Sequence, residues 1–207
     1  MRADPLTAEA FAGATAEAAA VQAFGSATLR EDQVRLGLWM ILATVTMLFA
    51  AFASAYIVRR SGSDWRQVAL PEILWVNTLV LAASSVALEA ASRSGVARRW
   101  RVARGAFAAA LTLGLGFLAG QIAAWRQMVD AGIYLPTSPH SSFFYMLTGA
   151  HALHVVAALI VLTWGVAATW SGDRHPAAWA ARVGLCRTFW HYLGAVWVCL
   201  FALVSIY

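Results

Sequence analysis

Two histidines, His151 and His154, lie in a stretch that is otherwise almost entirely apolar, FFYMLTGAHALHVVAA at residues 143–158. An imidazole in such surroundings can bind a haem or a metal, relay protons, or hydrogen-bond between neighbouring helices. Because the two residues are three apart, both rings project from one face of a helix, close to Tyr145 and Thr148. The residue types by themselves leave all three roles open.

A haem held inside a helical bundle needs axial ligands that face each other at a similar depth. His191 begins the fifth apolar stretch at one end of the bundle, whereas His151 lies roughly 13 Å from the opposite end of the fourth. A metal would also recruit a carboxylate or a thiolate, but no acidic residue falls between Asp130 and Asp173. Hydrogen bonding between helices is therefore the favoured role, and no catalytic residue, cofactor ligand or metal ligand is predicted.

Composition places these side chains in a membrane. The 207 residues are 61% hydrophobic and 12% charged, which leaves too little polar surface to cover a water-soluble core. Each of five apolar stretches reaches the roughly 20 residues that a helix needs to cross a bilayer core of about 30 Å. We predict an all-α, polytopic membrane protein, a bundle of five transmembrane helices at residues 36–58, 73–91, 102–124, 143–168 and 189–207.

All fifteen basic residues are arginine, and they are distributed unequally. Eleven lie in the N-terminal segment and in the second and fourth loops, and the other side has only Arg59, Arg60, Arg66 and Arg126. By the positive-inside rule, residues 1–35 form a cytoplasmic tail and the C-terminus of the five-helix domain, residues 36–207, lies outside. The arginine cluster at residues 93–104 is expected to bind anionic lipid headgroups and no nucleic acid.

Small and polar residues within the spans predict how the helices pack. Gly116 and Gly120 are four apart, which lets a second helix approach closely, with Gln121 beside them as a hydrogen-bond donor. Glu89 is four residues before Arg93, so an ion pair on one helix face is favoured over a proton route. The second span also carries groups that can bond across helices or to their own carbonyls: Asn77, Thr78, Ser84 and Ser85.

Three motifs occur in order on the second, fourth and fifth spans: LPEILWVNTLVLAASS, FFYMLTGAHALHV and FWHYLGAVWVCLF. Together they resemble subunit III of haem-copper cytochrome c and quinol oxidases, in its short five-helix bacterial form. The resemblance runs from about residue 36 to residue 207. The positions that match the family pattern, taken as structural or interface residues, are Trp75, Asn77, Thr148, Gly149, His151, His154, Trp190, His191 and Trp197.

The resemblance implies an accessory subunit without redox centres in the bacterial inner membrane. Haems and copper would lie in partner subunits I and II of a proton-pumping terminal oxidase. This chain would pack against subunit I, hold phospholipid in a cleft, and support sustained proton uptake and turnover. The electron donor, cytochrome c or quinol, and membership of a larger respiratory supercomplex stay open.

The chain also departs from the family pattern at two positions. Val45 stands where relatives commonly carry an intramembrane glutamate, and Gly194 stands where they carry an aspartate, so no role that needs those carboxylates is expected. Two alternatives remain: the related protein associated with nitric oxide reductases, and a small transporter with a polar path through the histidines and Asn77. The transporter is disfavoured because the sequence has neither an inverted repeat nor paired broken helices.

Overall fold

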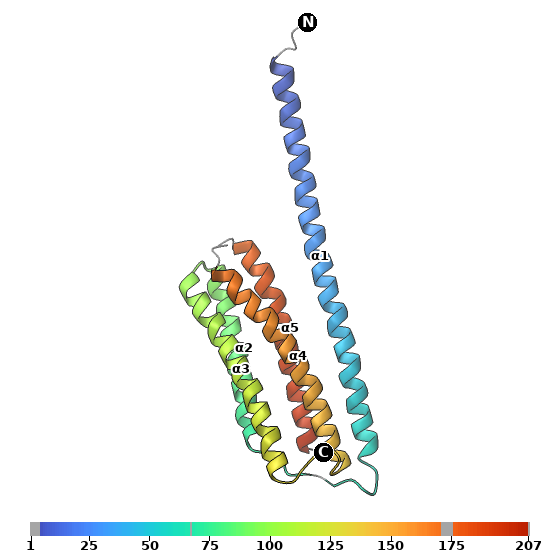
Figure 1. The fold of residues 1–207 in the computed structure, drawn as a ribbon. Helices are drawn as coiled ribbons and strands as arrows, with labels where there is room; N and C mark the ends of the chain where they lie inside the picture. The colour runs from blue at the N-terminus through green and yellow to red at the C-terminus, as the bar shows by residue number, and fades with distance from the viewer. Residues whose placement is uncertain (1–4, 67, 171–175, 207) are drawn as a thin grey trace. The chain divides into compact units, whose positions relative to one another are not determined.

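The computed structural model describes residues 5–66, 68–170 and 176–206. Side chains are described from Asp32 on, apart from those of residues 166, 168–170, 176–178 and 180–182. Within these ranges there is no strand, and the prediction of an all-α protein is confirmed. The five helices are α1 (Pro5–Arg59), α2 (Ile73–Val96), α3 (Trp100–Asp130), α4 (Pro139–Trp170) and α5 (Pro176–Ile206) (Figure 1).

Each helix contains a segment long and apolar enough to cross a membrane, which confirms the predicted number of spans. Every such segment overlaps its predicted span and most extend beyond it, because the polar residues at the span ends do not break a helix. The segments are Asp32–Arg59, Ile73–Val96, Trp100–Asp130, Pro139–Gly165 and Val183–Ile206.

Helix α1 also includes most of the segment that the sequence assigned to a tail. It begins at Pro5, and proline is favoured in the first turn of a helix because it lacks the backbone N–H. The alanine-rich residues that follow have high intrinsic helix propensity. The chain divides into two compact units, residues 1–41 and 42–207. The boundary at residue 35 and the cytoplasmic location of the tail stay predictions.

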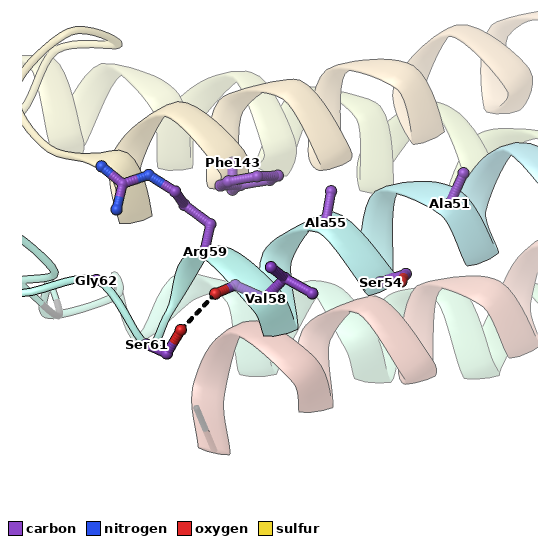
Figure 2. A pocket seen from close by; sticks show the side chains of 8 residues that line it. All are labelled: Ala51, Ser54, Ala55, Val58, Arg59, Ser61, Gly62 and Phe143. Atoms are coloured by element: carbon purple, nitrogen blue, oxygen red, sulfur yellow. Dashed lines mark hydrogen bonds between the residues drawn. The ribbon is translucent and has the colours of Figure 1, made fainter.

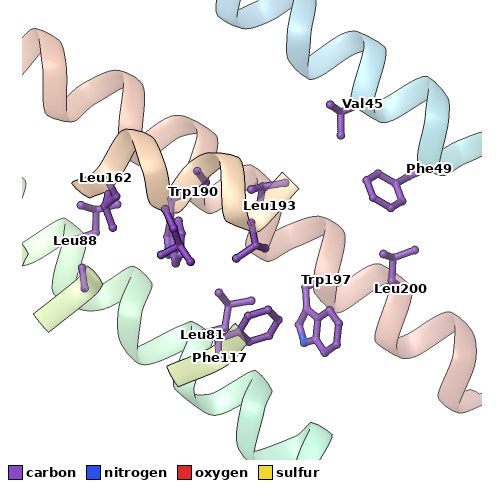
Figure 3. Close-up of a cluster of buried hydrophobic side chains, with 14 of the residues drawn as sticks. Val45, Phe49, Leu81, Leu88, Phe117, Leu162, Trp190, Leu193, Trp197 and Leu200 are labelled. Atoms are coloured by element: carbon purple, nitrogen blue, oxygen red, sulfur yellow. The ribbon is translucent and has the colours of Figure 1, made fainter. Parts of the chain in front are cut away.

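Within residues 42–207, close backbone approaches join α2 to α3 and α5, and join α4 to α3 and α5. Large side chains fill the interior between these helices (Figure 3). Trp190, Trp197 and Phe117 are almost completely buried there. None of these close backbone approaches involves the described part of α1, which instead reaches the core through side chains such as Phe49 and Tyr56.

Polar bonds and one glycine hold α2 against α3. Asn77 Nδ2 donates to the Phe117 carbonyl at 2.9 Å, and Ser84 Oγ donates to the Ala110 carbonyl at 2.8 Å. A Cβ added at Gly120 would lie 2.1 Å from Asn77 Oδ1, so glycine is required for this approach. The prediction of cross-helix bonding by these polar residues is therefore confirmed.

The other two residues of the glycine motif behave differently. A Cβ at Gly116 would meet only the Val80 side chain, at 3.9 Å, so this position has room for a methyl group. Gln121 is buried, but within the described part of the chain neither atom of its amide has a hydrogen-bond partner. Its predicted role as a donor between helices is not seen.

Candidate functional site: the polar and aromatic core

His151 lies in the middle of an aromatic cluster contributed by three other helices. Its ring centroid is 5.3 Å from that of Trp197, 6.0 Å from that of Phe117 and 6.3 Å from that of Phe49. The side chain is almost completely buried, and among the residues described neither ring nitrogen has a hydrogen-bond partner. The His151 ring is therefore held by packing against aromatic rings, and the predicted hydrogen bond between helices is not seen.

The polar tie between α3 and α4 is made one turn away from His151. Trp125 Nε1 donates to Thr148 Oγ1 at 3.0 Å, and Thr148 Oγ1 donates to the Phe144 carbonyl at 2.7 Å. His154 bonds within its own helix, since its Nδ1 lies 2.7 Å from the Ala150 carbonyl and must donate to it. Thr148 therefore has the linking role that the sequence suggested for the histidines.

Two of the three tryptophans of α5, Trp190 and Trp197, fix that helix against α2, α3 and α4. Trp197 Nε1 donates to Thr78 Oγ1 at 3.0 Å, which ties α5 to α2. Trp190 fills the space over Gly114, where an added Cβ would come within 2.7 Å of the indole ring. Together with Asn77, these residues form the shared centre of the bundle.

The remaining family-pattern residues lie outside this centre. Trp75 is 64% exposed and packs edge-on against Phe201, with 4.8 Å between ring centroids. A Cβ added at Gly149 would meet no other atom within 4 Å, so packing inside this chain does not require a glycine there. His191 is exposed at the middle of α5, which begins fifteen residues before it, and not at the start of the fifth span as the sequence predicted. These three positions are open to contact with lipid or with another chain.

Glu89 joins α2 to α5 at the end of the bundle that carries the arginine cluster. Arg93 Nε donates to one carboxylate oxygen at 2.8 Å, which confirms the predicted pair. Arg187 Nη1 donates to the other oxygen at 3.3 Å, and His191 Nε2 lies 4.0 Å from it. Arg187 was not predicted as a partner because it lies 98 positions away in the sequence.

The two positions where relatives carry carboxylates are filled differently. Val45 is buried in the apolar core, and a Cβ at Gly194 would lie 3.9 Å from Ser85 Oγ. Next to Val45, Thr46 Oγ1 lies 2.8 Å from Tyr192 Oη, so a pair of hydroxyl groups joins α1 to α5. The partners are 146 positions apart, and no local spacing in the sequence indicates the pair.

An open groove lies between α1 and α4, at the opposite end of the bundle from Glu89 (Figure 2). Its volume is about 740 Å³, and its lining is mostly small or apolar: Ala51, Ser54, Ala55, Val58, Arg59, Ser61, Gly62 and Phe143. It adjoins a polar hollow of about 640 Å³, which shares Arg59 and Phe143 with it. In this hollow Arg59 Nη1 donates to Asp64 Oδ1 at 2.7 Å, and this bond lowers the pKa of Asp64.

Within the described residues, no group of three or more histidine, cysteine, aspartate or glutamate side chains is placed to hold a metal ion.

The pattern of the family described as cytochrome c oxidase subunit III matches residues 15–207. The chain belongs to this family. The match begins inside α1, further toward the N-terminus than the motifs alone indicated.

Relatives from the subunit III family cover most of this chain. The probable cytochrome c oxidase subunit 3 of Mycobacterium tuberculosis is 30% identical over 187 residues, which are 84% of this chain and 88% of the relative. The cytochrome bo(3) ubiquinol oxidase subunit 3 of Pseudomonas putida is 31% identical, over 82% of this chain and 83% of the relative. Subunit III relatives thus occur in oxidases named for either electron donor.

Proposed function

We propose that this chain is the accessory, non-redox subunit III of a proton-pumping haem-copper terminal oxidase that reduces oxygen to water. The observation that supports this most directly is the family match, which extends over all five spans. Subunit I would dock on the chain, and subunits I and II would carry the haems and copper. The N-terminus would lie in the cytoplasm, as the arginine distribution predicts.

The core described above supports a structural role for the family-pattern residues. His151 is enclosed by aromatic rings, and Thr148 and Trp197 make bonds between helices. Such a core stabilises the bundle and leaves its outer face for partner chains and lipid. Electron transfer would therefore take place in the partner subunits alone.

The end of the bundle that carries the arginine cluster supports a second part of the proposal, assistance to proton uptake. Glu89 and His191 are titratable groups close together on that end, beside Arg93 and Arg187. In the predicted orientation this end faces the compartment from which protons are taken. Loss of the chain would remove this surface and slow proton delivery to the catalytic subunit.

Deleting the chain is expected to leave the haem spectrum and the initial oxygen consumption of the oxidase largely unchanged, with activity then decaying during turnover. The decay follows because slower proton delivery leaves the catalytic centre longer in reactive intermediates. The measurement is a time course of oxygen consumption with and without the chain, at equal haem content and neutral pH. If oxygen consumption declined at the same rate with and without the chain, a role in turnover would be contradicted. Immediate loss of haem from the oxidase without the chain would indicate an assembly factor.

The groove between α1 and α4 supports the third part of the proposal, retention of phospholipid. Ala51 and Ala55 line the groove with small side chains that leave space, and Arg59 lines both the groove and the polar hollow. An acyl chain would fill the apolar part, and a headgroup would lie beside the charged end. Bound lipid would then occupy space that the helices of this chain leave open.

Exhaustive removal of phospholipid is expected to weaken the association of the chain with its oxidase. Adding phospholipid back should restore that association. The variant Ala55→Trp should reduce bound phosphorus per haem because the indole occupies the groove, whereas Ala43→Trp, elsewhere on the exposed part of α1, should not. Phosphate analysis and retention of the chain on a sizing column provide the measurements. Full retention after delipidation would contradict the role of lipid.

A further inference from the structure

Three aromatic side chains meet at the end of the bundle where the groove lies, and we call them the aromatic box. They are Tyr56 of α1, Trp65 of the loop that follows, and His140 in the first turn of α4. Ring centroids are 5.0 Å apart for Tyr56 and Trp65, 5.4 Å for Trp65 and His140, and 6.1 Å for Tyr56 and His140. Tyr56 and His140 are both completely buried.

The polar atoms of the aromatic box lack protein partners. Tyr56 Oη, Trp65 Nε1 and both ring nitrogens of His140 are buried, with no hydrogen bond to any residue that the structure describes. The Val204 carbonyl is near the His140 ring but outside hydrogen-bond geometry. Buried polar groups are almost always satisfied, and ordered water satisfies them where protein does not. Three such groups on rings that contact one another can share one ordered water.

We propose that one ordered water molecule is bound between Tyr56, Trp65 and His140. One water can bond three of the four polar atoms, and the second ring nitrogen of His140 is left near the Val204 carbonyl. The indole N–H can only donate, so the water accepts from Trp65. A neutral imidazole has one nitrogen that accepts, so the water donates to His140, and the Tyr56 hydroxyl can take either role.

The bound water has a consequence for α1. The described part of this helix makes no close backbone approach to the other helices. Within residues 42–207 its contacts with them are therefore made by side chains. Tyr56 is the most deeply buried of them and also packs against Phe143 of α4, with ring centroids 5.6 Å apart. The water would therefore link α1, the loop after it and the start of α4. This inference does not depend on the proposed role in an oxidase.

A density map of the intact complex at a resolution that shows waters tests the proposal directly. A peak within hydrogen-bond distance of Tyr56 Oη, Trp65 Nε1 and a His140 nitrogen is expected. The same peak should be absent in the variant Tyr56→Phe, which keeps the ring and removes the hydroxyl. No peak in the parent protein, or a direct bond between Tyr56 Oη and His140, would overturn the proposal.

A double-mutant cycle provides a second test. Tyr56→Phe and His140→Phe should each lower the unfolding midpoint of the chain in its complex by about 2–4 °C. Because each removes a ligand of one water, the double variant should fall short of the summed shifts. Tyr145→Phe is the matched control, since Tyr145 Oη donates directly to the Ile133 carbonyl at 2.8 Å and should combine additively with His140→Phe. Additive shifts for Tyr56 and His140 would contradict a shared water.

Discussion

Replacing Gly120 by alanine is expected to destabilise the chain by on the order of 2 kcal/mol. The new Cβ would lie 2.1 Å from Asn77 Oδ1, so the Asn77 side chain must move. Movement breaks its 2.9 Å bond to the Phe117 carbonyl and leaves a buried amide unpaired between α2 and α3. Water is scarce at this depth in a bilayer, so no solvent molecule replaces the lost partner. Thermal unfolding in detergent, followed by tryptophan fluorescence, is the measurement.

Gly116→Ala is the matched control for this prediction. The substitution is chemically identical and lies one turn earlier on the same helix, but its Cβ would meet only Val80, at an ordinary 3.9 Å. Its unfolding midpoint should equal that of the parent chain or rise slightly, because alanine has the higher helix propensity. Equal destabilisation by the two alanines would show that helix flexibility, and not contact with Asn77, explains why glycine is required.

Replacing Trp197 by leucine is expected to have the largest effect of any single substitution described here, on the order of 3 kcal/mol. The indole packs against Phe117 with ring centroids 5.0 Å apart and against His151 at 5.3 Å, and its N–H bonds Thr78. Leucine leaves a cavity among these groups and an unpaired hydroxyl at Thr78. The amount of folded chain recovered with the oxidase and its unfolding midpoint are the measurements.

Trp75→Leu is the control that shows whether loss of stability follows from burial of a tryptophan or from its place in the family pattern. Both tryptophans match the family pattern, but Trp75 is 64% exposed and its ring contacts only Phe201 among the aromatic contacts described. The stability of the isolated chain should change little with this substitution. If Trp75→Leu destabilised the isolated chain as much as Trp197→Leu, the burial of Trp197 would not be the cause of its effect.

Some features of the site follow from short stretches of sequence because their cause is local. The ion pair of Glu89 with Arg93 requires only that the two residues be one helical turn apart. The family motifs identified the residues around His151 but not what they contact. Thr148, and not the histidine, makes the bond to α3, because that contact depends on the angle at which the two helices cross.

The motifs of the sequence identified the subunit III family by resemblance, and its composition by itself determined a membrane protein of five helices. The reason is that a bilayer requires long apolar helices whose backbone bonds are satisfied internally, and these are visible in composition and length. Only the tertiary structure decided which polar groups meet: Thr46 with Tyr192, Glu89 with Arg187, and the aromatic box of Tyr56, Trp65 and His140. These contacts join segments far apart in the chain, and they depend on how the helices are rotated and placed, which no local spacing records.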